Sequence, residues 1–221
     1  MIEFESKAAL EQALSQAIAA ALKDAITIKG EATLLLSGGS TPSGVYTLLS
    51  HADLPWDRVK VGLVDERFVS HSSPFSNFKL IGETLLQNKA KAATLVSMVR
   101  IESDYDGNLQ QIEEAYRIFT DTDVCLLGMG PDGHTASIFP NDAASAAANI
   151  ATSCLLSNTN APAEPTQRIT CNGPLLRRSK HLFLMITGTQ KKEILAQSEQ
   201  LQLPIAAFQT ALTETYYTSA S

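Results

Sequence analysis

Short, uninterrupted apolar runs alternate with helix-like segments along most of this 221-residue chain. A run that is apolar at nearly every position is typical of a strand buried on both faces, as in a parallel sheet. Parallel strands need long crossover connections, which helices supply. The alternation therefore predicts an α/β protein with a doubly wound, mostly parallel sheet and helices on both faces. The predicted strands cover residues 32–37, 58–66, 94–99, 123–128, 153–158 and 181–188, with a final edge strand at 213–218.

Helical periodicity fills the intervals between these runs. Apolar residues recur every three or four positions over 6–23, where Ser6 is a suitable N-cap. Another helix is expected to begin at Pro42, with Thr41 as its cap, because proline suits the first helical position. The remaining predicted helices cover 76–86, capped by Ser76, 106–119 and 189–197.

The chain shows no internal repeat and no strong boundary signal. The stretch 159–167 contains two prolines and little apolar content, which favours a surface loop over a linker. Residues 1–221 are therefore predicted to form a single α/β domain.

Charge and cysteine usage narrow the class of protein. The formal net charge is −6, which disfavours binding to nucleic acid, itself a polyanion. The N-terminal segment lacks the basic and apolar regions of a signal peptide, and no apolar run is long enough to span a membrane. Three widely spaced cysteines are typical of reduced thiols. These features predict a cytoplasmic protein without nucleic-acid or membrane partners.

The sequence SGGSTPSG at 37–44 follows a predicted strand and opens a predicted helix. Such a loop directs backbone N–H groups and the positive end of a helix dipole toward one point, which favours anion binding. Gly38 and Gly39 would let the backbone turn tightly, and Ser40 and Thr41 would add hydroxyl donors. A tight strand–helix turn without a ligand explains the same residues equally well.

A second glycine-rich turn, GMGPDG at 128–133, also follows a predicted strand. It matches the dinucleotide pattern formally, but the region about 20 residues further on offers no acidic residue for a ribose. The glycines, Gly130 among them, more simply let the backbone approach a small ligand.

His134 follows this turn directly, with Asp132 two residues before it. A neutral imidazole accepts a proton near neutral pH, and a carboxylate can orient the ring, so this pair is a candidate catalytic base. A helix-capping or loop histidine is the alternative. The other three histidines show no metal-ligand spacing, so no metal site is predicted.

Three further segments carry candidate binding residues. The sequence VDERF at 64–68 places Asp65 at the end of a predicted strand and Arg67 just after it, where Arg67 could hold a phosphate or an oxyanion, or only a surface ion pair. Asn77 lies downstream and could contact a sugar hydroxyl. Arg168 and Lys191 could bind a phosphate, since a lysine at a helix start opposes the dipole unless an anion lies nearby.

Together these motifs resemble the 6-phosphogluconolactonase family. The matching pieces occur in order as LLLSGGSTPSGVY, VDERFV with SNFKL, LLGMGPDGHTASIFP, and RITCNGPLL with LFLMITGTQKKEIL. The resemblance runs from about residue 4 to about 205. It implies the Rossmann-like fold shared with glucosamine-6-phosphate deaminase and ribose-5-phosphate isomerase.

The resemblance also implies an activity, namely hydrolysis of 6-phospho-D-glucono-1,5-lactone in the oxidative pentose phosphate pathway. The expected partner is this phosphorylated sugar lactone, with no metal or organic cofactor, and the expected state is a monomer or weak homodimer. His134 would activate water, and Asp132 would orient the imidazole ring. The phosphate would bind the 37–44 loop, Arg168 and Lys191.

Two alternatives stay open from the sequence. A deaminase-like sugar-phosphate isomerase shares the D-G-H turn, but its pattern has an asparagine–glutamate–proline ending where this chain has Ile138, Phe139 and Pro140. A non-catalytic sugar-phosphate sensor would usually carry a DNA-binding segment, and residues 1–30 contain only one predicted helix.

Overall fold

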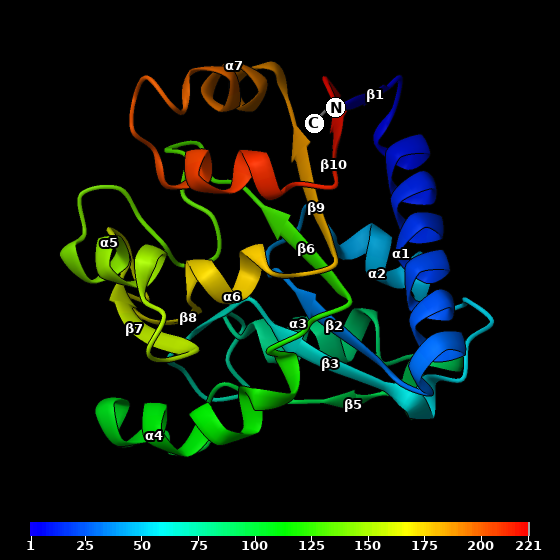
Figure 1. Cartoon of the computed structure of the whole chain (residues 1–221), viewed down its shortest axis with the longest axis horizontal. Coiled ribbons are helices and arrows are strands. Elements are labelled where there is room, and N and C mark those ends of the chain that lie inside the picture. The colour runs from blue at the N-terminus through cyan, green and yellow to red at the C-terminus, as the bar shows by residue number, and fades with distance from the viewer. Residues whose placement is uncertain (221) are drawn as a thin grey trace.

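Seven strands form one sheet in the order β1-β10-β9-β6-β2-β3-β5, and each neighbouring pair is parallel (Figure 1). The computed structural model describes residues 1–220. The doubly wound α/β prediction is confirmed. The strands of this sheet are β1 (Ile2–Phe4), β2 (Ala32–Leu36), β3 (Val59–Leu63), β5 (Thr94–Leu95), β6 (Val124–Gly128), β9 (His181–Thr187) and β10 (Glu214–Thr218).

A second, antiparallel sheet of three strands lies beside the first, in the order β4-β8-β7. Its strands are β4 (Asp65–Arg67), β7 (Leu156–Asn160) and β8 (Gln167–Cys171). The chain passes from one sheet to the other at Val64, whose N–H donates to Leu36 O while its carbonyl accepts from Cys171 N. The prediction of one strand over 58–66 is therefore wrong, because this stretch is divided between two sheets.

The α-helices are α1 (Lys7–Lys29), α2 (Ser43–Leu49), α3 (Asn77–Thr84), α4 (Tyr105–Tyr116), α5 (Ala143–Ile150), α6 (Gly173–Arg177) and α7 (Thr189–Gln197). Short 3₁₀ helices are η1 (Trp56–Arg58), η2 (Asn88–Ala92), η3 (Arg117–Phe119) and η4 (Pro204–Ala211). The predicted caps Ser6 and Ser76 are confirmed, since each side chain accepts a hydrogen bond from a first-turn N–H. Thr41 is not a cap, because α2 begins at Ser43 after Pro42 and has no side-chain cap bond.

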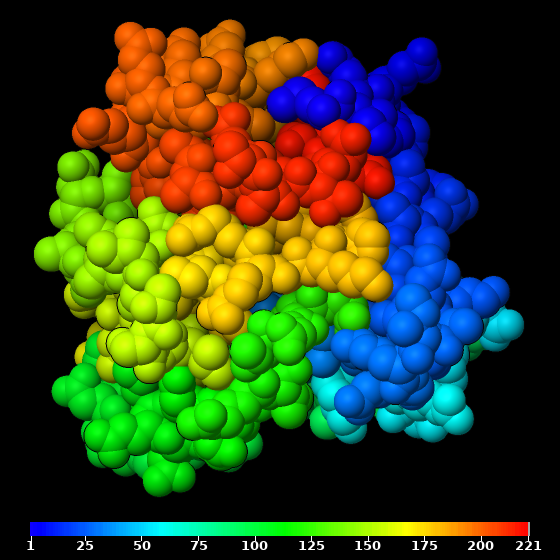
Figure 2. Space-filling view, viewed as in Figure 1, coloured from blue at the N-terminus to red at the C-terminus, as the bar shows by residue number. Residues whose placement is uncertain are grey.

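Three other boundary predictions are wrong for tertiary reasons. The strand over 213–218 is internal, because the N-terminal residues 2–4 pair with it as β1. Figure 2 shows these two ends of the chain side by side, in dark blue and red. The strand over 94–99 is only two residues long. The predicted loop over 159–167 is shortened by β7 and β8, which pair across it.

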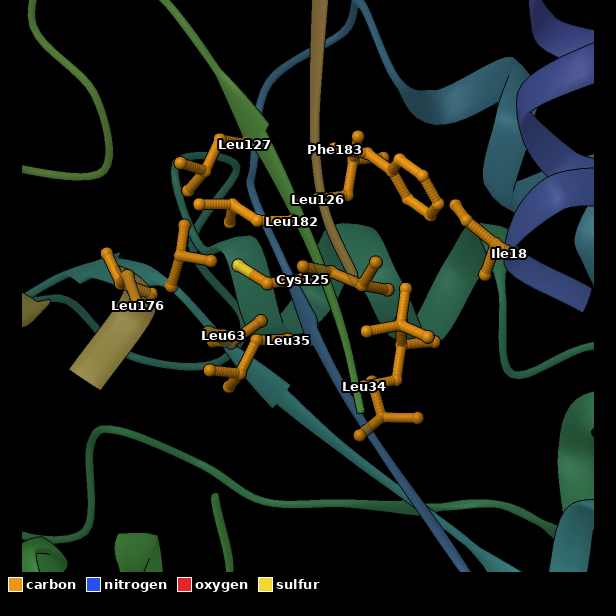
Figure 3. Packing of buried hydrophobic residues seen from close by; sticks show 14 of the residues in the cluster. Ile18, Leu34, Leu35, Leu63, Cys125, Leu126, Leu127, Leu176, Leu182 and Phe183 are labelled. Carbon is orange, nitrogen blue, oxygen red and sulfur yellow. The ribbon is translucent and has the colours of Figure 1, made fainter. Parts of the chain in front are cut away.

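One apolar cluster fills both faces of the large sheet. Figure 3 shows Ile18 of α1 and Leu176 of α6 on opposite sides of the central strands, with Leu34, Cys125 and Leu182 between them. Among residues 1–220, no helix is both long and apolar enough to cross a membrane.

Close packing at Gly62 of β3 generates a stability prediction. A Cβ there would lie 2.6 Å from Phe119 Cζ and 2.9 Å from Leu35 Cδ2. Gly62→Ala should therefore overpack the sheet and lower the free energy of unfolding by about 1–3 kcal/mol. Gly82→Ala in α3 is the control, because nothing lies within 4 Å of its Cβ; it should gain about 0.5–1 kcal/mol. Urea denaturation measures both, and equal effects would contradict the packing argument.

Candidate active site

A cavity of about 220 Å³ opens at the carboxyl ends of the parallel strands. The sheet order reverses beside β2, with β3 on one side and β6 on the other, and ligands of such sheets bind at this switch point. The cavity is lined by Ser37, Gly38, Gly39, Thr41, Pro42, Asp65, Arg67, Asn77, Leu127, Gly128, Met129, Gly130, His134, Ala136, Arg168, Met185 and Lys191. The structure therefore brings together ten of the twelve predicted site residues; Ser40 and Asp132 are not in the lining.

The loop after β2 forms one wall. Gly38 has no room for a side chain, because a Cβ there would collide with the amide of Asn77. Gly39 has φ +91°, a backbone conformation that favours glycine. The Ser37 hydroxyl is buried and finds no hydrogen-bond partner among the described residues. Ser40 is exposed, and its carbonyl accepts from Ser43 Oγ at 2.7 Å.

Asp65 is only 7% exposed and accepts hydrogen bonds from residues that surround the cavity. Ser137 Oγ donates to Asp65 Oδ2 at 2.5 Å, and Asn77 Nδ2 donates to the Asp65 carbonyl at 2.9 Å. Asp65 therefore holds two groups of other segments in place at the cavity.

Glu66, beside it, is 1% exposed and points away from the cavity into the start of α3. Its carboxylate accepts from the N–H groups of Arg67, Asn77 and Phe78 at 2.7–2.8 Å and from Ser76 Oγ at 3.1 Å. Burial raises the pKa of Glu66, although these N–H donors act in the opposite direction. The carboxylate fixes the loop that carries Arg67 to the helix that carries Asn77.

Arg67 and Arg168 lie directly opposite each other on β4 and β8. Like charges at such a position repel, and neither guanidinium forms an ion pair within the described part of the chain. Arg67 Nη1 donates to Phe75 O at 2.7 Å, while its buried Nε has no partner there. Burial and then the charge of Arg67 lower the pKa of Arg168. An anion between the two would offset this repulsion.

His134 and Asp132 form a hydrogen-bonded pair in the loop after β6. The Nδ1–Oδ1 distance is 2.6 Å, and since a carboxylate only accepts, Nδ1 carries a hydrogen; in the neutral form of the ring the lone pair is then on Nε2. Burial raises the pKa of Asp132, but its bonds to His134 outweigh this and the net shift is downward. At Gly130 a Cβ would collide with the His134 ring, so this glycine leaves the space that the ring occupies.

Lys191 and Lys192 follow each other in α7 but differ in their surroundings. Lys192 Nζ pairs with Glu3 at 2.8 Å and lies over the Tyr217 ring. Lys191 lines the cavity without an acidic partner among residues 1–220, and burial lowers its pKa. Its ammonium group is thus a cation available to a ligand.

Three further residues at the site, Ser37, Ser137 and Phe139, were not predicted from the sequence. All three lie inside or beside the two glycine-rich motifs, but serine and phenylalanine are common in turns and cores and carry no specific signal there. Within the described residues no group of three or more histidine, cysteine, aspartate or glutamate side chains is arranged to hold a metal ion.

A glycine-rich loop, three cations without acidic partners among the described residues and a histidine–aspartate pair meet at one switch-point cavity of an α/β protein, an arrangement that suits a small anionic ligand. Residues 5–217 match the family model described as glucosamine-6-phosphate isomerases/6-phosphogluconolactonase, and the chain belongs to this family.

Several relatives carry the second of these names. A 6-phosphogluconolactonase from Neisseria meningitidis serogroup A is 36% identical over 218 residues, covering 92% of this chain and 90% of the relative. One from Rhizobium meliloti is 35% identical, with the same coverage. The crystal structure of a 6-phosphogluconolactonase from Shewanella baltica superposes with a TM-score of 0.90 at 32% identity, covering 99% of this chain and 96% of that one.

Proposed function

We propose that this protein hydrolyses 6-phospho-D-glucono-1,5-lactone to 6-phospho-D-gluconate. The observation that carries the proposal is the convergence of the His134–Asp132 pair and three unpaired cations on one cavity. The names of the relatives agree with it. A 6-phosphate supplies the anion that the cations lack, and a lactone needs only a base and an oxyanion partner.

The phosphate binds the backbone amides of Gly38 and Gly39, the Thr41 hydroxyl, Arg168 and Lys191 in this proposal. Ser40 was also predicted to bind it, and its exposed side chain would have to turn inward to do so. Asn77 lines the cavity where a sugar hydroxyl would lie.

The reaction then proceeds in two proton transfers. Nε2 of His134 takes a proton from water as the water oxygen bonds to the lactone carbonyl carbon, and Asp132 stabilises the imidazolium that forms. Arg67 stabilises the oxyanion. As the tetrahedral intermediate collapses, the bond from this carbon to the ring oxygen breaks, and His134 returns the proton to that oxygen.

The wider assignments of the sequence analysis stay predictions. A single functional domain is consistent with the one apolar cluster. A cytoplasmic location rests on the three cysteines, which are free in the structure. The predicted oligomeric state is a monomer or weak homodimer. The protein is also predicted to have no nucleic-acid partner, no membrane partner and no cofactor.

His134→Asn should lower the rate of lactone hydrolysis by about 10²–10⁴-fold, because it removes the base. The lactone is best generated in the assay by glucose-6-phosphate dehydrogenase, since it also hydrolyses without a catalyst. His181→Gln is the control, because His181 begins β9 outside the cavity lining and should leave the rate unchanged. Full turnover by His134→Asn would remove His134 from the chemistry. Failure of the wild type to accelerate hydrolysis, with ammonia released from glucosamine 6-phosphate, would favour the deaminase alternative.

Arg67→Ala should lower kcat by about 10²–10³-fold, because an oxyanion partner acts in the transition state. Steady-state kinetics measure kcat and KM separately and so distinguish an effect on the transition state from an effect on substrate binding. Arg178→Ala is the control, since its Nε donates to the Pro174 carbonyl on an exposed surface away from the cavity. A rise in KM with unchanged kcat would instead assign Arg67 to the phosphate.

Lys191 should make product affinity depend on pH. Because burial lowers its pKa, the free enzyme loses this ammonium charge at a lower pH than an exposed lysine would. Calorimetry of 6-phosphogluconate binding from about pH 8 to about pH 10 should show affinity falling in the wild type but much less in Lys191→Arg, whose guanidinium stays charged. Lys192→Ala should behave as the wild type. Identical curves for the wild type and Lys191→Arg would contradict a role for Lys191 in phosphate binding.

A further inference from the structure

We propose that Phe139 is a positioning residue that holds the His134 imidazole and the Arg168 guanidinium in fixed places across one aromatic ring. Its ring centroid lies 4.8 Å from that of His134, with 45° between the ring planes. The guanidinium carbon of Arg168 lies 5.7 Å from the same centroid. The expected kinetic effect rests on the proposed function. The observed contacts of Phe139 with His134 and Arg168 do not depend on it.

The turn that contains His134 delivers the Phe139 ring to this place. Thr135 and Ile138 form an isolated antiparallel bridge, and Ala136 between them has a positive φ of 49°. Thr135 Oγ1 donates to Gly128 O at 2.8 Å, which ties the turn to the end of β6. Phe139 is 6% exposed, so its ring is held by packing. The turn therefore folds Phe139 back against the ring of His134.

His134 needs a second restraint besides Asp132. The covalent link at Cγ and the hydrogen bond at Nδ1 hold one side of the imidazole, while no described residue hydrogen-bonds Nε2 on the other side. Contact with the Phe139 ring restricts movement of the imidazole as a whole. Together the two contacts fix the direction of the Nε2 lone pair, on which proton transfer depends.

Arg168 depends on the same ring for a different reason. Its Nε donates to the Pro165 carbonyl at 2.7 Å, and Arg67 repels it from the opposite strand. No carboxylate within the described chain pairs with it. The face of an aromatic ring attracts a cation, so Phe139 supplies an attraction that does not neutralise the charge. The guanidinium stays available to the phosphate.

Phe139 also lines a second cavity, with Leu203 and Pro204, that does not include His134 or Arg168. The residue is therefore shared between that cavity and the two site groups that its ring contacts. Truncation of Phe139 would leave space beneath both groups, and either could move into it.

Phe139→Leu tests the proposal, with Phe208→Leu as a matched control. Phe208 is also buried under an arginine, with the Arg177 guanidinium carbon 5.2 Å from its centroid, but it lies outside the active-site lining. Both variants lose an aromatic–arginine contact. Only Phe139→Leu should lower kcat/KM for the lactone, by about 10–100-fold, through both a lower kcat and weaker binding of 6-phosphogluconate. Phe139→Tyr, which keeps the ring, should restore most of the activity.

A second readout does not depend on turnover. The ¹⁵N resonances of the His134 ring report its tautomer, and the wild type and Phe208→Leu should show one tautomer with hydrogen on Nδ1. Phe139→Leu should show a mixture. If Phe139→Leu does not fold, Phe139→Met replaces it, because it has a similar volume without the ring.

The outcomes separate the two proposals. Equal kcat/KM and equal tautomer populations in Phe139→Leu and Phe208→Leu would overturn the positioning role. A tautomer mixture confined to Phe139→Leu, in a protein that does not hydrolyse the lactone, would support the positioning role and reject the proposed function. Loss of activity in Phe139→Tyr equal to that in Phe139→Leu would also overturn the positioning role of Phe139.

Discussion

The parallel pairing of β2, β3, β6 and β9 is the constraint on which the site depends. These strands run in one direction, so the loops that follow them meet at one edge of the sheet. The 37–41 loop, the β4 arginine, the His134 turn and Lys191 come from distant parts of the sequence, yet they face one cavity. A side chain placed at the opposite ends of these strands could not join them.

The second constraint is charge. Arg67 and Arg168 oppose each other on neighbouring strands, and Lys191 lies in the same lining without an acidic partner in the described structure. Such a cluster costs stability when no ligand is present, because burial and repulsion both disfavour it. An anionic ligand would offset that cost. The chain as a whole is acidic, with a formal net charge of −6, so the three cations of the cavity contrast with its overall charge.

The sequence was informative where structure follows from local pattern. Buried parallel strands such as β2 and β6 are continuous apolar runs, and Ser6 and Ser76 cap helices through their own next turn. Strands β1, β4 and β8 were missed because each is short or polar and exists only through its distant partner. For the site, ten of the seventeen lining residues were predicted, five of them from the two glycine-rich turns after strands and five from charged or amide side chains in other segments. The contacts of Glu66 and Phe139 depend on tertiary packing, for which the sequence holds no spacing signal.

The three carboxylates near the cavity argue for His134 as the base. Asp65 accepts from Ser137 and Asn77, and Glu66 accepts four hydrogen bonds, so removing either from its partners would leave buried donors unsatisfied. Asp132 has a lowered pKa and lies behind the imidazole, outside the lining, which makes it a poor proton acceptor for a bound water. The imidazole lines the cavity, and no described residue hydrogen-bonds its Nε2. We therefore infer that the surrounding acids act as a scaffold, and that Nε2 of His134 is the group among them best placed to accept a proton.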